Sequence, residues 1–176
     1  MLSLRAVLQW SFTFYRVVFN MITRNYWLMK SEPDVFGISD LKNAPNQTTM
    51  WEGVRNYEAR NFMRDKMQIG DGVLFYHSNA TPPGIVGTAI ISSDTYPDPT
   101  QFNPDSDYFD PKSTEEKPRW FLVNVTFMSI FNRLITREEL QSHPILSEMM
   151  LFKRNRLSIT PVSEEEWNSI HKILEE

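Results

Sequence analysis

The sequence has no cysteine among its 176 residues. Without thiols, the chain has no disulfide framework, no thiolate metal site and no cysteine nucleophile. This absence fits a reducing compartment, and we expect a cytoplasmic protein. Because the chain has an ordinary length and ordinary proportions of hydrophobic and charged residues, we expect one domain with a substantial core.

Several motifs of enzymes are missing as well. The chain has no G-x-S-x-G nucleophile elbow, no H-E-x-x-H zinc motif, no phosphate-binding G-x-x-x-x-G-K loop and no dinucleotide-binding fingerprint. The three histidines, His77, His143 and His171, are far apart and have no carboxylate at ligand spacing. Since zinc sites need three or four convergent ligands, we expect no metal. We likewise expect no cofactor and no catalysis.

Acidic residues are absent from the start of the chain, and Glu32 is the first. The chain has 18 basic and 22 acidic residues, and Arg5 and Arg16 precede Met21. From Met21 onward, 16 basic residues therefore face 22 acidic ones, which gives a net charge of −6. Such a protein gains little from nonspecific attraction to phosphates. A nucleic-acid partner would need a local basic face and a specific pocket.

Residues 1–20 differ from the rest because they are apolar and aromatic with a basic start. Gln9 and Arg16 interrupt the apolar run, which is shorter than the ~20 residues that span a bilayer. We expect no stable membrane association, although a weak interfacial helix is an alternative. The preferred interpretation is that Met21 is the initiator, so that 1–20 is an extension and 21–176 is the domain.

Strand and helix patterns alternate after Met21. Apolar runs predict strands, and apolar residues at helical spacing, together with capping residues, predict helices. A segment with five of the eleven prolines, 93–118, is expected to be an irregular surface loop. The strands are too irregular for a sandwich, and crossover helices are too few for a parallel sheet. We expect an α+β fold, a small mixed β-barrel with peripheral helices. The expected strands are 26–30, 72–78, 85–92, 120–131 and 157–162, and Pro161 indicates an edge or an end of the last one. The expected helices are 39–41, capped by Ser39, 55–67, and two that open with the capping boxes Thr136–Glu139 and Ser163–Glu166.

Aromatic and polar residues gather near the ends of these elements. Aromatic rings offer flat apolar faces, whereas lysine, serine and asparagine offer hydrogen-bond donors and acceptors, so the set suits a planar heterocycle. The alternative is that Trp51 and Tyr57 belong only to the core. The residues concerned are Trp51, Tyr57, Tyr76, His77, Ser78 and Asn79, with the KSEP segment that begins at Lys30.

Seven segments, in this order along the chain, resemble the EVE domain family. They are YWLMKSEP (26–33), WEGVRNYEARNFMRD (51–65), GDGVLFYHSN (70–79), PPGIVG (82–87), YFDPKS (108–113), PRWFLV (118–123) and NRLSITPV (155–162). The resemblance implies a PUA-like fold, related to the YTH readers of methylated adenine. It also implies that the protein binds a modified nucleobase in DNA or RNA and is not an enzyme. One departure is Arg154, where the family more often has glycine.

The resemblance also assigns ligand-binding roles. It implies that Trp51 is a wall of the pocket, that Lys30 and Ser31 face it, that Ser78 and Asn79 close its floor, and that Pro83, Gly84 and Gly87 bring backbone near the ligand. Tyr57 and Tyr76, which residue type selected, complete the expected ligand-binding set. The two glycines would leave room for close approach of the ligand. Candidate phosphate contacts are Arg55, Arg60 and Arg156, with Arg64, Lys153 and Arg154 as further candidates; the alternative is a solvated helix face.

Two other functions remain open. The pocket could hold a free nucleoside or metabolite, which the negative net charge favours. Alternatively, Lys30 and His77 could serve a PUA-like nuclease or hydrolase.

Overall fold

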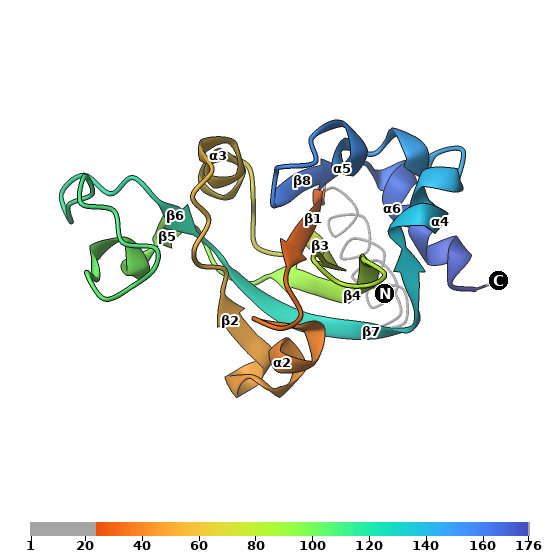
Figure 1. Cartoon of the computed structure of the whole chain (residues 1–176), viewed down its shortest axis with the longest axis horizontal. Coiled ribbons are helices and arrows are strands. Elements are labelled where there is room, and N and C mark those ends of the chain that lie inside the picture. Colours follow the sequence, from red (N-terminus) through yellow and green to blue (C-terminus); the bar gives the residue numbers. More distant parts are fainter. Residues whose placement is uncertain (1–23, 176) are drawn as a thin grey trace, which may run out of the picture.

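The computed structural model describes residues 24–175 (Figure 1). The predicted extension 1–20 lies outside these residues. Within them, the strands are β1 (Tyr26–Ser31), β2 (Thr48–Met50), β3 (Gly72–His77), β4 (Gly84–Ile91), β5 (Tyr96–Pro97), β6 (Phe121–Leu122), β7 (Asn124–Thr136) and β8 (Ile159–Val162). The helices are α2 (Ile38–Asn43), α3 (Tyr57–Asp65), α4 (Arg137–Ser142), α5 (Met150–Lys153) and α6 (Glu164–Ile173), with 3-10 turns η1 (Pro45–Gln47), η2 (Pro99–Phe102) and η3 (Leu146–Glu148).

The main sheet has the strand order β2-β7-β4-β3-β1-β8. Strands β1 and β3 are parallel, and the other neighbours are antiparallel. The long strand β7 curves beneath the others, so the sheet curls (Figure 1). In the described part of the chain, the edge strands β2 and β8 do not pair with each other. The expected α+β fold with a mixed sheet is confirmed, as a half-barrel rather than a closed barrel.

Both faces of the central strands are buried. Side chains alternate along a strand, so Trp27 and Met29 enter one core cluster, whereas Leu28 between them enters the other. On β3, Phe75 enters the same cluster as Trp27, and Leu74 enters the same cluster as Leu28. This explains why both strands have uninterrupted apolar sequences. The edge position of β8, which Pro161 indicated, is confirmed.

Helix boundaries follow the capping residues. The side chain of Asn56 accepts hydrogen bonds from the backbone N–H groups of Glu58 (2.9 Å) and Ala59 (3.1 Å), so α3 begins two residues later than expected. Ser163 and Glu166 form the expected capping box of α6. Ser39 was expected to cap α2, but this is wrong, because Gly37 precedes the helix and donates its N–H to the Asp40 carboxylate (2.7 Å).

Three further differences concern the strands. The run 120–131 divides into β6 and β7, β7 continues to Thr136, and the short edge strand β2 has no clear pattern in the sequence. The proline-rich segment 93–118, which contains β5 and η2, projects from one end of the molecule (Figure 1). Among the described residues, no helix combines the length and the apolar character that crossing a membrane requires.

Candidate functional site

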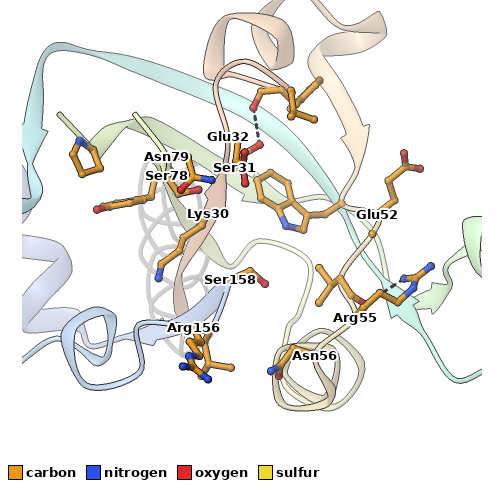
Figure 2. Close-up of a pocket in the computed structure, with 18 of the residues that line it drawn as sticks. Lys30, Ser31, Glu32, Glu52, Arg55, Asn56, Ser78, Asn79, Arg156 and Ser158 are labelled. Atoms are coloured by element: carbon orange, nitrogen blue, oxygen red, sulfur yellow. Dashed lines mark hydrogen bonds between the residues drawn. The ribbon is translucent and has the colours of Figure 1, made fainter. Parts of the chain in front are cut away.

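A cavity of about 1110 Å³ lies at the carboxyl ends of β1 and β3. Its wall includes residues from six separate stretches of chain, several of which Figure 2 shows. It brings together most of the residues that the sequence selected, namely Lys30, Ser31, Trp51, Arg55, Tyr76, Ser78, Asn79, Pro83 and Arg156. Their ligand-binding roles stay predictions, but their convergence on one cavity is a property of the fold.

Trp51 belongs both to the core and to the cavity wall. Its side chain is 7% exposed and meets the ring of Phe75 edge-on, with centroids 5.5 Å apart. Its backbone N–H donates to the carbonyl of Val123 (3.0 Å), which fixes the start of the segment that leads to α3. Within residues 24–175, its indole N–H has no hydrogen-bond partner. Trp51 can therefore offer a ligand both an apolar ring and a donor.

Lys30 and Tyr76 lie side by side on neighbouring strands, because they are paired in the parallel register of β1 and β3. The Lys30 ammonium donates to the carbonyl of Asn155 (3.0 Å). Burial, and then the nearby Arg137 guanidinium, lower the pKa of Lys30. Burial raises the pKa of the Tyr76 phenol, and Arg137 opposes this rise. Tyr76 therefore stays a neutral hydroxyl at physiological pH.

The polar side chains of the cavity wall differ in whether they already have a hydrogen-bond partner. The Ser31 hydroxyl donates to the carbonyl of Phe36 (2.6 Å), so it holds the turn that follows β1. The side chains of Ser78 and Asn79 have no hydrogen-bond partner in the described part of the chain. Asn79 has a φ of 51°, a left-handed conformation that asparagine tolerates. These two side chains are free to meet the edge of a ligand.

Three of the predicted ligand-binding residues, Tyr57, Gly84 and Gly87, lie outside the cavity wall. A Cβ atom on Gly84 or Gly87 would be 2.2 Å from the carbonyl oxygen of Ile135 or Ser129, respectively. These glycines thus allow β4 to approach β7, which accounts for them without a ligand. Tyr57 is 47% exposed and stacks on Trp120, with centroids 4.8 Å apart.

Arg55 holds the projecting segment against the cavity. Its guanidinium forms an ion pair with Asp98 (2.8 Å) and donates to the hydroxyl of Thr100 (3.0 Å) and the carbonyl of Tyr108. Burial raises the pKa of Asp98, but hydrogen bonds from Arg55, Thr100 and Gly53 hold it below its ordinary value. Arg55 is therefore occupied by protein groups.

The other candidate phosphate contacts differ in whether their side chains are already bound by protein groups. Arg60 donates to the carbonyl of Arg119. Ion pairs join Arg64 to Asp65, Lys153 to Glu148 and Arg154 to Glu58. Arg156 is exposed at the cavity and has no partner among residues 24–175. Of this set, Arg156 is the side chain most available to a phosphate.

Tyr108 and Arg137 are among the residues of the cavity wall that the sequence analysis missed. The Tyr108 ring lies against Gly53, where an added Cβ atom would be 2.5 Å from the ring. Arg137 reaches the cavity because its backbone N–H donates to the carbonyl of Pro83 (2.8 Å). The capping signal at Thr136 places Arg137 at the start of a helix, but no sequence signal brings that helix to the cavity.

His77 does not line this cavity. Its Nε2 accepts a hydrogen bond from the backbone N–H of Ile38 (3.2 Å), so the ring holds the start of α2. Burial lowers the pKa of His77, although Asp40 opposes this shift. Within residues 24–175, no three acidic, histidine or cysteine side chains are grouped as metal ligands. The geometry thus gives His77 a structural role, since its ring accepts the hydrogen bond from the first residue of α2.

Comparison with known proteins gives matches over most of the chain. The sequence profile of the EVE domain family matches residues 25–173. Thymocyte nuclear protein 1 of Gallus gallus is 44% identical, over 88% of this chain and 71% of the relative. Human THYN1, in its crystal structure in complex with 5-methylcytosine-containing DNA, is 43% identical in sequence to this chain. The structural match has a TM-score of 0.82 and covers 86% of this chain and 98% of that one. A YTH domain from Zygosaccharomyces rouxii has the same fold at 15% identity, with a TM-score of 0.50 over 87% of this chain and 88% of that one.

Proposed function

The chain belongs to the EVE domain family, and on this premise we propose that its cavity binds a modified nucleobase of DNA or RNA without catalysing a reaction. The PUA-like α+β fold that the resemblance implied is confirmed. A human relative that is 43% identical was crystallised with 5-methylcytosine-containing DNA. For this chain, 5-methylcytosine is therefore the first base to test.

The observation that supports this function best is the position of Trp51 in the cavity wall, with an indole N–H that lacks a partner among the described residues. Stacking of a base on an aromatic ring contributes ~1–3 kcal/mol, and hydrogen bonds to the edge of the base select it. The free side chains of Ser78 and Asn79 are placed to make such edge contacts. Exclusion of water around one added methyl group contributes a further ~1–3 kcal/mol of discrimination.

A panel of modified nucleosides tests this proposal, first free and then within single-stranded and duplex oligonucleotides. Calorimetry should show that one modified base binds more tightly than its unmodified counterpart. Because a base in a duplex must first leave the stack, which costs a few kcal/mol, single strands should bind more tightly than duplexes. If every base in the panel bound with the affinity of its unmodified counterpart, the proposal would be wrong.

A free nucleoside is the second candidate ligand, and the excess of acidic over basic residues favours it. Salt dependence separates the two candidates. Binding of a polymer weakens with added salt in proportion to the number of phosphates contacted, whereas binding of a neutral nucleoside does not. We propose Arg156 as a phosphate contact of the polymer, since Arg55 and Arg60 are bound to protein groups.

The hydrolase alternative has a separate test. Labelled DNA and RNA are incubated with the protein in the presence of different divalent metals. We expect no cleavage, because the imidazole of His77 accepts a backbone hydrogen bond away from the cavity. Cleavage that is abolished in His77→Ala would establish an enzyme instead. The cytoplasmic location stays a prediction from the sequence.

A further inference from the structure

The cavity wall carries two positive charges, those of Lys30 and Arg137. Lys30 and Tyr76 are paired on β1 and β3, Tyr76 is paired with Ile85 of β4, and Ile85 with Ile135 of β7. This row crosses four adjacent strands. Arg137 follows the end of β7, two residues beyond Ile135, and lines the same cavity. The row therefore begins at Lys30, with Tyr76 beside it on the next strand, and Arg137 follows two residues after the other end of the row.

Neither charge is neutralised. The Lys30 ammonium donates to a backbone carbonyl, that of Asn155. The Arg137 guanidinium donates to the side-chain amide of Gln141 (3.3 Å) and lies 5.0 Å from the centroid of the Phe152 ring. Among residues 24–175, no carboxylate is within 4.0 Å of either group, and the Tyr76 hydroxyl has no partner.

Two other cations close to this cavity are paired with acids, whereas Arg156 at the cavity is exposed and has no partner among residues 24–175. Arg55 pairs with Asp98, and Arg154 pairs with Glu58. By contrast, the charge of Arg137 acts on Lys30, and it adds to burial in lowering the Lys30 pKa. Two like charges on a half-buried wall destabilise each other. An arrangement of this kind, in a chain with more acids than bases, is stabilised by an anion that binds between the charges.

We propose that Lys30 and Arg137, with the Tyr76 hydroxyl, form a subsite for the phosphate group of a bound nucleotide. The inference rests on the proposed function, since it assigns the phosphate that accompanies the base. Trp51 belongs to the core cluster on one face of the sheet, and Tyr76 to the cluster on the other face. The cavity thus extends around the ends of β1 and β3, from the wall proposed for the base to the wall with the two cations. Figure 2 shows Lys30 on the opposite side of the cavity from Glu52 and Arg55.

The size of the cavity agrees with a nucleotide. Its volume of about 1110 Å³ exceeds the range of ~300–1,000 Å³ that is typical of sites for one small ligand. A base alone would leave the cationic wall facing water. The cavity has room for a nucleotide with its base at one end and its phosphate at the other, where the phosphate would accept hydrogen bonds from the ammonium, the guanidinium and the phenol.

The experiment compares 5-methyl-2′-deoxycytidine with its 5′- and 3′-monophosphates by calorimetry. One monophosphate should bind about 10- to 100-fold more tightly than the nucleoside, because hydrogen bonds between charged groups are strong. In Arg137→Gln this advantage should disappear, while the affinity for the nucleoside stays unchanged. Arg64→Gln is the matched control, since it removes the same charge from the exposed face of α3. Equal affinity of nucleoside and monophosphates for the wild type, or equal losses in both variants, would overturn the subsite.

A second arm separates this subsite from the proposed function. Inorganic phosphate is titrated while the side-chain Nε–H signal of Arg137 is followed by NMR, with Arg64 as the reference signal. A saturable shift at Arg137 without binding of any nucleoside in the panel would keep the subsite and remove the base-binding proposal. If a nucleoside bound but neither phosphate nor either monophosphate shifted the Arg137 signal, the base-binding proposal would stand and the phosphate subsite would be wrong.

A third arm identifies the source of the phosphate. Oligonucleotides that contain 5-methylcytosine carry one neutral methylphosphonate, placed either before or after the modified nucleotide. If the subsite holds a phosphate of the polymer, one of these two positions should weaken binding to the wild type about tenfold or more and leave Arg137→Gln unaffected. If neither position matters while a monophosphate still gains affinity through Arg137, the subsite serves free nucleotides.

Discussion

Trp51 serves two roles, and substitution should affect both. Its ring is as buried as that of Trp120, with 7% and 6% exposure. Trp51→Ala and Trp120→Ala should therefore each lower the free energy of unfolding by ~3–5 kcal/mol, the usual range for a buried tryptophan. Chemical denaturation measures this. An unchanged stability of Trp51→Ala would mean that the ring does not pack on Phe75 as described. The effects on binding should differ between the two variants, which makes Trp120 the control for Trp51.

The charge on Lys30 predicts a pH dependence of binding. Burial and Arg137 lower the Lys30 pKa from its ordinary value of 10.5, so Lys30 loses its proton at a lower pH than a free lysine. Affinity for 5-methyl-2′-deoxycytidine monophosphate should hold near neutral pH and fall as the pH rises through this lowered pKa. Tyr76 does not titrate in the same window, because burial raises its pKa above 10.0.

The stability of the free protein should change in the opposite direction. The unfolded state binds the Lys30 proton more tightly, so the free energy of unfolding should rise with pH through that window. Calorimetry between neutral and alkaline pH measures both trends, with Lys30→Gln as the control. A fall in affinity that persists unchanged in Lys30→Gln would assign the titration to another group.

At the level of elements, the Arg55 ion pair fixes the projecting segment. Asp98 has a side chain that is 2% exposed, so Arg55→Ala leaves a buried carboxylate without its partner. Such a loss costs ~3–5 kcal/mol. Amide hydrogen exchange should therefore accelerate in the segment 99–119, whereas Arg64→Ala should leave this segment unchanged. If exchange in the segment stayed slow and only salt-dependent DNA binding was lost, Arg55 would be a phosphate contact, as the sequence suggested.

The glycines of β4 can be tested in the same way. A Cβ atom on Gly87 would lie 2.2 Å from the Ser129 carbonyl oxygen, and backbone atoms of a sheet have little freedom to move. Gly87→Ala should therefore lower the melting temperature strongly. Nucleoside affinity, corrected for the folded fraction, should be unchanged. Normal stability combined with lost binding would return Gly87 to the ligand site.

For the molecule as a whole, local sequence patterns predicted the helices and strands better than they predicted the long-range contacts between them. The apolar runs of β1 and β3, the Ser163 cap and the edge strand with Pro161 are visible in the sequence, because each depends on near neighbours. The three-residue strand β2 is too short to produce a pattern. Tyr108 and Arg137 reach the cavity through long-range packing that leaves no local signal.

The candidate site shows the same limit. The resemblance to the EVE domain family, together with residue type, selected seven ligand-binding residues that do line the cavity. Charge and residue type also selected Arg55 and Arg60, but a single sequence does not show which acids and carbonyls will already occupy a guanidinium. It likewise does not show that Gly84 and Gly87 face a neighbouring strand instead of a ligand.

The most direct test of the central claim is a measurement of affinity for two single-stranded oligonucleotides that differ only in one base modification, beginning with 5-methylcytosine and cytosine. The wild type should prefer the modified strand by about 5- to 150-fold, the equivalent of ~1–3 kcal/mol. Trp51→Ala should lose binding to the modified strand, whereas Trp120→Ala should retain the preference under conditions where circular dichroism shows both variants to be folded. A wild type without preference for any modified base in the panel, or a preference that persists in folded Trp51→Ala, would contradict the account.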